Sequence, residues 1–389
     1  MANNRVYYAI QQVTFGKDSN GAGGTRTAAH GVQSIGITTN FNLEQVFELG
    51  QISIYENVEG TPDVEVTMSK VLDGYIPLYC LATSDQSNGP ALTNRVDSDV
   101  KAFVQLGIWD EAKQSAGEDS STAGSWVEMS GLVVSSVGYN FPLDDNFSED
   151  ITLVGNYKVW KSGTATNTVS TDCGVSYYPN GAAGAFGGNN DAPIGDGGVN
   201  RRENIQFAKS VTNTNKADYT ILPEDIPGVD TSGQIGTAHV SSITVSTDVS
   251  REDIFELGAK LPYAKTVTFP VEVTCDIEVT TASGDLVNAL DDCTDDSACN
   301  TKSNLNERRI RIATCEGLRI WMGQKNKLSS VSYGGGDAGG GNATVTYSYS
   351  NFNDFTVMHS GDISGNGGAA DGGTWWDARD SYVGTGVYY

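Results

Sequence analysis

Apolar and polar residues alternate along several segments of the chain. In residues 64–71 (VEVTMSKV) and again in residues 243–247 (ITVST), nearly every second position is apolar. A period of two places successive side chains on opposite faces of a strand, so these segments are predicted to be half-buried strands. Helical patterns are sparse, and the better candidates are residues 98–109 and 284–292. The pattern therefore predicts a mainly β chain with one or two short helices.

The same seven-residue phrase occurs twice, as EQVFELG at 44–50 and as EDIFELG at 252–258. The offset of 208 extends upstream, where residues 32–40 match residues 240–248. From 32 to 50, nine of nineteen positions are identical to their partners at 240 to 258. Strands that merely resemble each other in composition do not hold one offset over such a length. The matches indicate an internal duplication.

Further matches follow downstream. A one-residue gap brings residues 64–74 onto 271–281. Val137 and Tyr139 then fall on Val345 and Tyr347, and residues 149–156 resemble residues 353–360 with a small slip. The junction is expected in the stretch rich in glycine and asparagine near 180–200. This predicts two tandem β units, residues 1–195 and residues 196–389.

Within the repeated phrase, the aromatic and leucine positions are predicted to be core anchors. Glycine allows a backbone bend at the end of each phrase. Glu48 and Glu256 lie between the anchors, where contact with an interface or with a channel is a further expectation. The predicted anchors are Phe47, Leu49 and Gly50 in the first unit, and Phe255, Leu257 and Gly258 in the second.

The chain of 389 residues is strongly acidic, with a formal net charge of −24 from 48 acidic and 24 basic residues. Binding DNA or RNA by phosphate neutralisation needs clustered lysine and arginine, and the basic clusters here are short: Arg201–Arg202 and residues 308–311. The charge is that of a soluble acidic protein. It also suits a surface that must not retain a passing polyanion.

The N-terminal residues lack the basic flank and apolar core of a signal peptide, and no stretch approaches the length of a membrane span. Synthesis in a cytosol is therefore expected, with the six cysteines mostly free thiols. Cys293 and Cys299 flank a short acidic loop, so a bond between them is the alternative left open.

A search for catalytic motifs returns little. The chain has three histidines and no metalloprotease, nucleophile-elbow or phosphate-binding-loop motif. The Asp-rich loop at 291–296 has four carboxylates, but its spacing fits no EF-hand, and a solvated loop is the preferred interpretation over a Ca²⁺ site. We expect no enzyme activity, no cofactor and no resident metal. The aromatic C-terminus, with Trp375 and Trp376, is expected to pack on its own domain or on a neighbouring subunit.

Residues 32–79 resemble the tail tube (major tail) proteins of tailed bacteriophages. Residues 146–160 are similar to a pattern late in that fold, and residues 197–207 with 221–229 look like the start of a second copy. The resemblance covers about two thirds of the chain, and its motifs are structural rather than catalytic. It implies two tandem tail-tube-like β-sandwich or barrel units, each with a short flanking helix.

The resemblance also implies a structural virion protein. Stacked rings would form a hollow tail tube, through which double-stranded DNA passes without specific binding. Chains with two units would close a ring as trimers with pseudo-sixfold symmetry, although six chains per ring is an open alternative. The implied partners are other copies of the chain, the tape measure, the baseplate hub, the terminator and, in a contractile tail, the sheath. The resemblance therefore implies assembly in the host cytoplasm and a final location in the phage tail.

Ring stacking or subunit contact is expected at the tip of a hairpin near 55–63, at its partner near 263–267 and at the polar loop 16–31, against the alternative of ordinary exposed turns. The residues predicted for these contacts are Tyr55, Glu56, Asn57, Val58, Glu59, Tyr263, Lys265, Trp375 and Trp376.

Two other functions are compatible with the sequence. The first is a baseplate hub or tail terminator, which uses similar units. The second is a secreted β-rich carbohydrate-binding protein that uses the C-terminal tryptophans. Either would give small particles under the electron microscope rather than long tubes.

Overall fold

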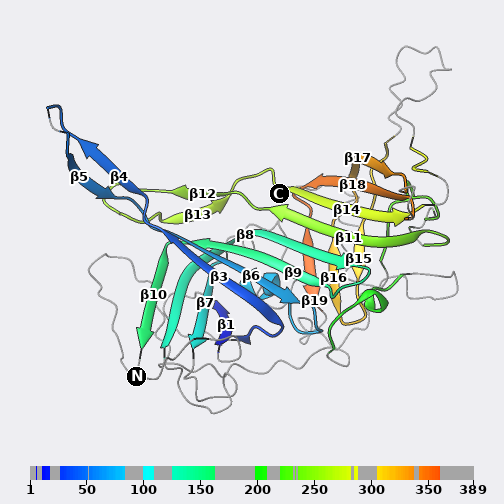
Figure 1. Ribbon diagram of the computed structural model, residues 1–389, viewed down its shortest axis with the longest axis horizontal. Coiled ribbons are helices and arrows are strands. Elements are labelled where there is room, and N and C mark those ends of the chain that lie inside the picture. Colours follow the sequence, from blue (N-terminus) through cyan, green and yellow to red (C-terminus); the bar gives the residue numbers. More distant parts are fainter. Residues whose placement is uncertain are drawn as a thin grey trace, which may run out of the picture.

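The computed structural model shows a mainly β protein, which confirms the fold class predicted from the alternating pattern (Figure 1). The structure describes residues 6, 11–17, 27–50, 52–83, 100–108, 125–162, 198–207, 220–230, 233, 235–281, 284–287, 305–336 and 341–359.

Eight antiparallel strands form one continuous sheet, which we call the long sheet. Its strand order is β3-β6-β9-β8-β11-β14-β18-β17. The first four are β3 (Val32–Asn40), β6 (Asp63–Val71), β9 (Ser148–Gly155) and β8 (Ser125–Pro142). The last four are β11 (His239–Asp248), β14 (Glu272–Thr280), β18 (Thr344–Phe352) and β17 (Lys327–Gly334).

The 18-residue strand β8 belongs to two layers. Its second half lies in the long sheet, whereas its first half pairs with β7 (Ala102–Ile108) and β10 (Tyr157–Ser162). Beyond β7 lie β1 (Gln11–Lys17) and β2 (Thr27–Ala28). Gly131, with φ of 67°, lies between the two halves of β8, where a left-handed backbone conformation favours glycine. The strand thereby connects two packed layers.

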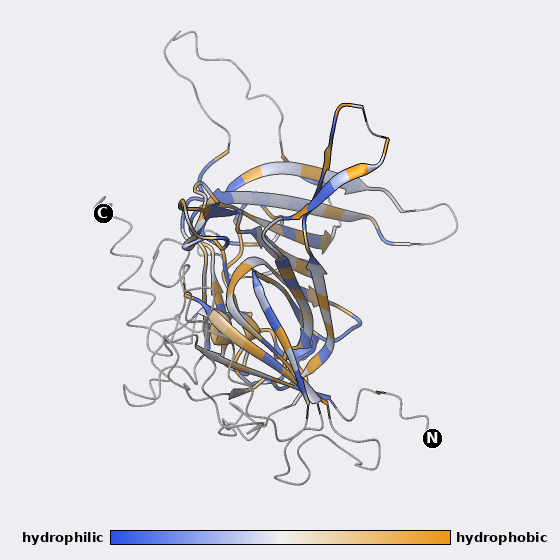
Figure 2. Ribbon diagram, turned by 90° about the vertical axis from the view of Figure 1, so that its left-hand side faces the viewer, coloured by the Kyte–Doolittle hydropathy of each residue, from blue (hydrophilic) through white to orange (hydrophobic). Residues whose placement is uncertain are grey.

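A small sheet of β15 (Arg311–Ala313), β16 (Leu318–Trp321) and β19 (Thr356–His359) contributes to the same core. The short helix α1 (Leu78–Thr83) contacts β8, β1 and β19, and a 3₁₀ turn spans Arg202–Asn204. Apolar side chains from both halves of the chain form one buried cluster, and Figure 2 shows the alternation of apolar and polar positions along the strands. The strands are therefore held by one shared core.

Two hairpins leave the long sheet. The first arm is β4 (Leu43–Phe47) with β5 (Ile54–Glu59), which connects β3 to β6. The second arm is β12 (Arg251–Ile254) with β13 (Ala264–Val267), which connects β11 to β14. The first arm projects far from the body of the molecule (Figure 1). Both arms occupy the same place in the order of strands.

The two groups of four strands repeat one pattern of pairing. In the first group, a row of paired core-facing residues runs Ile35, Met68, Ile151 and Val137. In the second group, the corresponding row runs Ile243, Ile277, Tyr347 and Val331. Irregularities in pairing recur at equivalent places, around Gln33 and Ser241 and around Ser135 and Ser329. The rows thus define which positions correspond.

These rows correct part of the predicted alignment. The offset of 208 holds through β3 and the first arm. However, Val64 corresponds to Val273 rather than to Val271, and Val137 corresponds to Val331 rather than to Val345. Residues 353–360 contribute β19 to another sheet instead of matching β9. Val and Tyr recur at alternate positions in many strands. An alignment by sequence identity alone therefore matched β8 with β18 instead of with β17.

The predicted helix at 98–109 is wrong, since residues 102–108 form β7. This strand lies between β1 and β8, and its side chains are nearly all buried, so the period-two signal is lost. The helix predicted at 284–292 falls mostly outside the described residues, and residues 284–287 are not helical. The expected boundary near residue 195 also lies outside them, so the division into two domains stays a prediction.

Candidate assembly surfaces

The two arms have the same internal geometry. Leu43 lies opposite Glu59 in the first arm, and Arg251 lies opposite Val267 in the second, so the pairing register keeps the offset of 208 on both strands. The backbone N–H of Gly60 donates to the carbonyl of Asn42 at 3.1 Å, and the N–H of Thr268 donates to Ser250 at 3.0 Å. The arms are therefore equivalent in hydrogen bonding as well as in sequence.

Each arm carries the repeated phrase to its tip. Gly50 and Gly258 have φ of 98° and 92°, a conformation that favours glycine, and an added Cβ at either position would contact nothing within 4 Å. The predicted glycine bend is therefore present in both arms, and the open space around it shows that backbone conformation alone requires glycine here.

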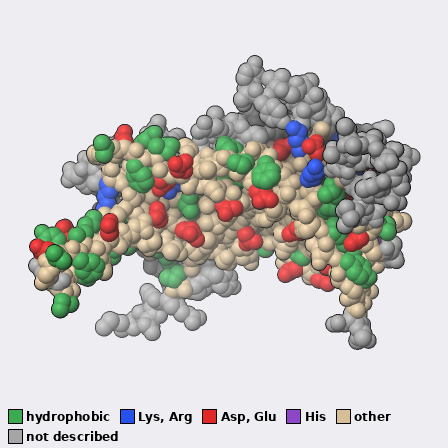
Figure 3. Space-filling model, turned by 90° about the horizontal axis from the view of Figure 1, so that it is seen from above, with side chains coloured by type: hydrophobic (Ala, Val, Ile, Leu, Met, Phe, Trp, Pro, Cys, Tyr) green, Lys and Arg blue, Asp and Glu red, His purple; other side chains and the backbone are tan. Residues whose placement is uncertain are grey.

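The core-anchor prediction for the neighbouring residues is wrong. Phe47 and Leu49 are 62% and 103% exposed, and Phe255 and Leu257 are 53% and 105% exposed. All residues of β4 and β5 are exposed. In the second arm Val267 is buried, but the repeated phrase lies toward the tip, where its apolar side chains remain in solvent. Ile52, at 103%, adds to this exposed apolar tip, which Figure 3 shows at the left-hand end of the molecule. The repeated phrase therefore forms an exposed apolar surface on each arm.

The predicted contact residues lie on these arms. Tyr55, Glu56, Asn57, Val58 and Glu59 belong to β5, whose residues are all exposed. Tyr263 is exposed on the second arm, whereas Lys265 is held by Asp253 across the hairpin at 2.5 Å. Contact of any of them with another chain stays a prediction. Trp375 and Trp376 lie outside the described residues.

The arms touch each other within the chain. The hydroxyl of Thr61, at the base of the first arm, donates to the carbonyl of Lys260 in the second arm at 2.8 Å. The ammonium of Lys260 lies 3.9 Å from Glu59, in an exposed pair of small energetic weight. The first arm thus rests on the turn of the second.

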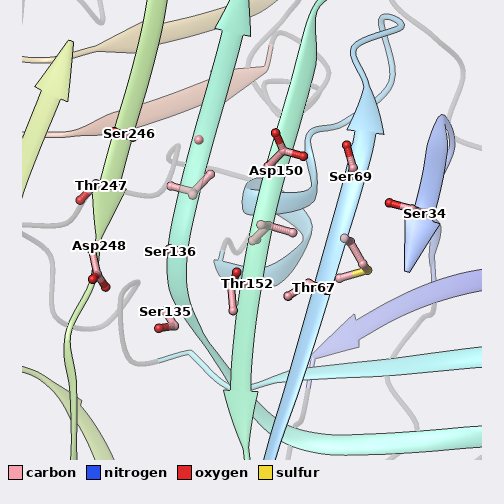
Figure 4. A pocket seen from close by; sticks show the side chains of 14 residues that line it. Ser34, Thr67, Ser69, Ser135, Ser136, Asp150, Thr152, Ser246, Thr247 and Asp248 are labelled. Atoms are coloured by element: carbon pink, nitrogen blue, oxygen red, sulfur yellow. The ribbon is translucent and has the colours of Figure 1, made fainter. Parts of the chain in front are cut away.

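The face of the long sheet opposite the core, which we call the polar face, is formed almost entirely of small hydroxylated and acidic residues. One row of paired positions crosses all eight strands: Ser34, Ser69, Asp150, Gly138, Ser246, Thr274, Ser350 and Lys327. The adjacent row includes Thr67, Thr152, Ser136 and Asp248. The residues of these two rows that lie on β3, β6, β9, β8 and β11 line an open concavity (Figure 4).

Charge on the polar face is strongly one-sided. Within the eight strands, Lys327 is the one lysine or arginine on this face, against seven carboxylates. These are Asp63, Glu65, Asp150, Asp248, Glu272, Asp276 and Glu278. Seen from above, the molecule shows acidic side chains scattered over a largely uncharged surface (Figure 3). Sequence reasoning did not single out these residues, although Glu65, Glu272, Asp276 and Glu278 each lie between two apolar core-facing residues.

Buried polar contacts hold the strands under this face. The carboxylate of Glu149 accepts hydrogen bonds from the backbone N–H groups of Leu78 and Tyr79, at 2.6 and 2.9 Å, and from the hydroxyl of Tyr139 at 2.8 Å. Burial raises the pKa of Glu149, and the charge of Lys70 and these hydrogen bonds oppose that shift. Burial followed by the charge of Glu149 raises the pKa of the Tyr139 hydroxyl. The contacts fix α1 and β9 against β8.

Among the described residues, no group of three or more His, Cys, Asp or Glu side chains could hold a metal ion, and no helix is long and apolar enough to span a membrane. The Asp-rich loop 291–296 and the pair Cys293 and Cys299 lie outside the described residues. Cys275 is a free buried thiol, Cys315 is a free exposed thiol, and Cys80 is buried.

No family model and no curated protein matches the chain. Solved structures that are similar to it in part include two from the anti-feeding prophage. One is the tube-terminating cap of the anti-feeding prophage, with 13% identity over 42% of this chain and 95% of that one, at a TM-score of 0.29. The other is a chain of the anti-feeding prophage baseplate, sixfold symmetrised, with 12% identity over 42% and 98%, also at 0.29. The likeness is coarse.

Proposed function

We propose that this chain is a structural virion protein that assembles into stacked rings and forms the hollow tube of a phage-type tail. The observation that carries the proposal is the polar face. It combines eight strands, hydroxylated side chains and seven carboxylates against one lysine on a continuous surface. The expected absence of enzyme activity and of a cofactor belongs to the same proposal.

In the tube, the polar face lines the channel. Carboxylates repel the phosphates of double-stranded DNA at short range, and salt at physiological strength screens this repulsion beyond about 8 Å. Retention of DNA would require lysine or arginine to release counterions from the phosphates, and Lys327 is the one such residue on this face of the eight strands. Serine and threonine keep the wall wetted without adding positive charge. DNA would therefore pass without being bound.

Repetition within the chain supports a ring. A heterologous contact that repeats by rotation closes into a ring when the rotation divides a full turn. With two equivalent groups of four strands in each chain, three chains supply six groups, which gives trimeric rings with pseudo-sixfold symmetry. The apolar tips of the two arms are then available for contact with neighbouring copies. Further partners in a tail would be the tape measure, the hub, the terminator or the sheath.

Negative-stain electron microscopy of the concentrated protein tests the proposal. Long hollow tubes, or rings that stack, are expected, and sedimentation of the same sample should show growth with concentration. Small particles of one chain at every concentration and salt tested would overturn it. They would favour instead the terminator-like or carbohydrate-binding alternatives.

A further inference from the structure

The long sheet ends in two edge strands. Within the described residues, β3 pairs only with β6, and β17 pairs only with β18. Neither strand contains proline, and Lys327 at the start of β17 is their only charged residue. An edge without charges, proline or a cover presents unpaired N–H and C=O groups to another strand. Apart from Lys327, these edges lack, within the part of the chain that the structure describes, the usual protection of a protein that remains a monomer.

The middle of the sheet supplies a template for joining such edges. There the last strand of the first group, β8, pairs with the first strand of the second group, β11. Val137 lies opposite Thr247, and Tyr139 lies opposite Val245. Val137 belongs to the core-facing row of the first group, and Ile243 belongs to the corresponding row of the second. Since Val137 lies opposite Thr247 rather than Ile243, the row of the second group is displaced by four residues along β11 relative to the row of the first. In the second group β17 holds the position that β8 holds in the first, and in the first group β3 holds the position that β11 holds in the second. The free edges of β17 and β3 are therefore equivalent to the two edges that pair at the internal junction.

Burial differs between the closed junction and the free edges. Tyr139 is 1% exposed inside the junction, whereas Tyr333, its equivalent in β17, is 54% exposed. Val249 is 1% exposed, whereas its equivalent Phe41 is 59% exposed. Side chains that are core residues at the internal junction are thus exposed at both ends of the sheet.

We infer that β17 of one copy of this chain pairs antiparallel with β3 of the next copy, in the register of the internal junction. Val331 then lies opposite Thr39 of the next copy, and Tyr333 lies opposite Ile37 of the next copy. The pairing covers both sets of exposed side chains and continues the polar face without interruption from one chain to the next. The inference rests on the proposed function, since it specifies how a ring of that tube closes.

Two hydrogen bonds beside the internal junction can be compared with the equivalent positions at the junction between chains. The N–H of Val249 donates to the carbonyl of Ser135 at 2.6 Å, and the equivalent bond joins Phe41 to Ser329 of the neighbour. Arg251 Nε donates to the carbonyl of Val134 at 2.7 Å, but the equivalent pair is Leu43 and Leu328. Leu43 is 63% exposed in the single chain. The junction between chains is therefore more apolar than the junction within a chain.

Crosslinking between two variants tests the pairing. One variant carries Ile37→Cys and the other Tyr333→Cys, both with the exposed Cys315 changed to serine. Opposed side chains on antiparallel strands lie about 5 Å apart at Cβ, within reach of a short bismaleimide. Mixing the variants under tube-forming conditions should give a covalent dimer that neither variant gives alone, above the background of the parent chain treated in the same way.

A matched control replaces Tyr333→Cys by Phe352→Cys. Phe352 is 58% exposed but lies on β18, one strand in from the edge, and should give no dimer with Ile37→Cys. Tubes that form without the Tyr333–Ile37 product, or with equal product from Phe352, would overturn the inferred register while leaving the tube intact. Failure of every mixture, and of the parent, to form rings or tubes would overturn the proposed function together with the junction.

Discussion

Leu49 and Leu257 occupy equivalent positions at the tips of two hairpins, and both side chains are fully exposed. Each follows an exposed phenylalanine and precedes a glycine with positive φ. Keeping such an apolar tip twice in one chain costs solubility without stabilising the core. The proposed contact between copies would account for the same sequence at both tips.

The double substitution Leu49→Asp and Leu257→Asp is expected to block or strongly weaken assembly while leaving the single chain folded. Exposed positions change the free energy of unfolding by about 0.5 kcal/mol or less, because little packing is lost. Urea unfolding of dispersed protein measures the stability, and sedimentation measures the assembly. Leu143→Asp, at a 45% exposed turn between β8 and β9, is the matched control and should assemble normally. Normal assembly of the double variant would exclude the arm tips from the contact.

Reversing charge on the polar face should create a DNA-binding channel. The substitutions Asp150→Lys and Asp248→Lys add positive charge on neighbouring rows without touching the core. Fluorescent duplex DNA is expected to remain with tubes of this variant at low salt and to dissociate as salt rises. Glu203→Lys with Glu307→Lys makes the same charge change at exposed positions away from the long sheet and the arms. If this control variant retained DNA as well as the sheet variant, the polar face would not be the channel wall.

Removing the Glu149 carboxylate should destabilise the fold markedly. Glu149→Ala leaves two N–H groups at the start of α1 and the hydroxyl of Tyr139 without their acceptor. The expected loss is about 3 kcal/mol in the free energy of unfolding, as for other buried charged partners. Tyr139→Phe removes a single hydrogen bond and should cost about 1 kcal/mol. Equal losses from the two variants in urea unfolding would contradict this assignment of roles.

Stability should fall in acid because of His359. Burial, followed by the charge of Lys70, lowers its pKa to about 4, below the ordinary value of 6.5. Below pH 6.5 the unfolded chain takes up a proton that the folded chain does not, so this contribution is lost as pH falls from 6.5 to 4. Above pH 6.5 it does not change. The loss amounts to about 3 kcal/mol.

Comparison with His359→Gln isolates this contribution, because the raised pKa of Glu149 acts in the opposite direction in both proteins. In urea unfolding from pH 7 to pH 4, the wild-type protein should lose stability relative to the variant by that amount. A difference that stays constant with pH would show that His359 is not kept neutral by the fold.

The sequence predicted the strands that alternate in polarity and the correspondence of β3 with β11, because local pattern and identity sufficed there. It did not predict β7, whose side chains are buried on both faces. It also placed Phe47 and Leu257 in the core, since apolar residues in a repeated phrase look alike whether a hairpin packs or projects. That difference is set by tertiary structure. The polar face was missed because its carboxylates are scattered along the chain and meet only when eight strands pair.

Cryo-electron microscopy of the assembled tube, at a resolution that shows side chains, tests the central claim most directly. The account predicts a hollow tube whose wall facing the channel carries Asp150, Asp248 and Asp276, with the core side of the long sheet turned outward. A channel lined mainly by lysine and arginine, or by residues from another face of the molecule, would contradict it.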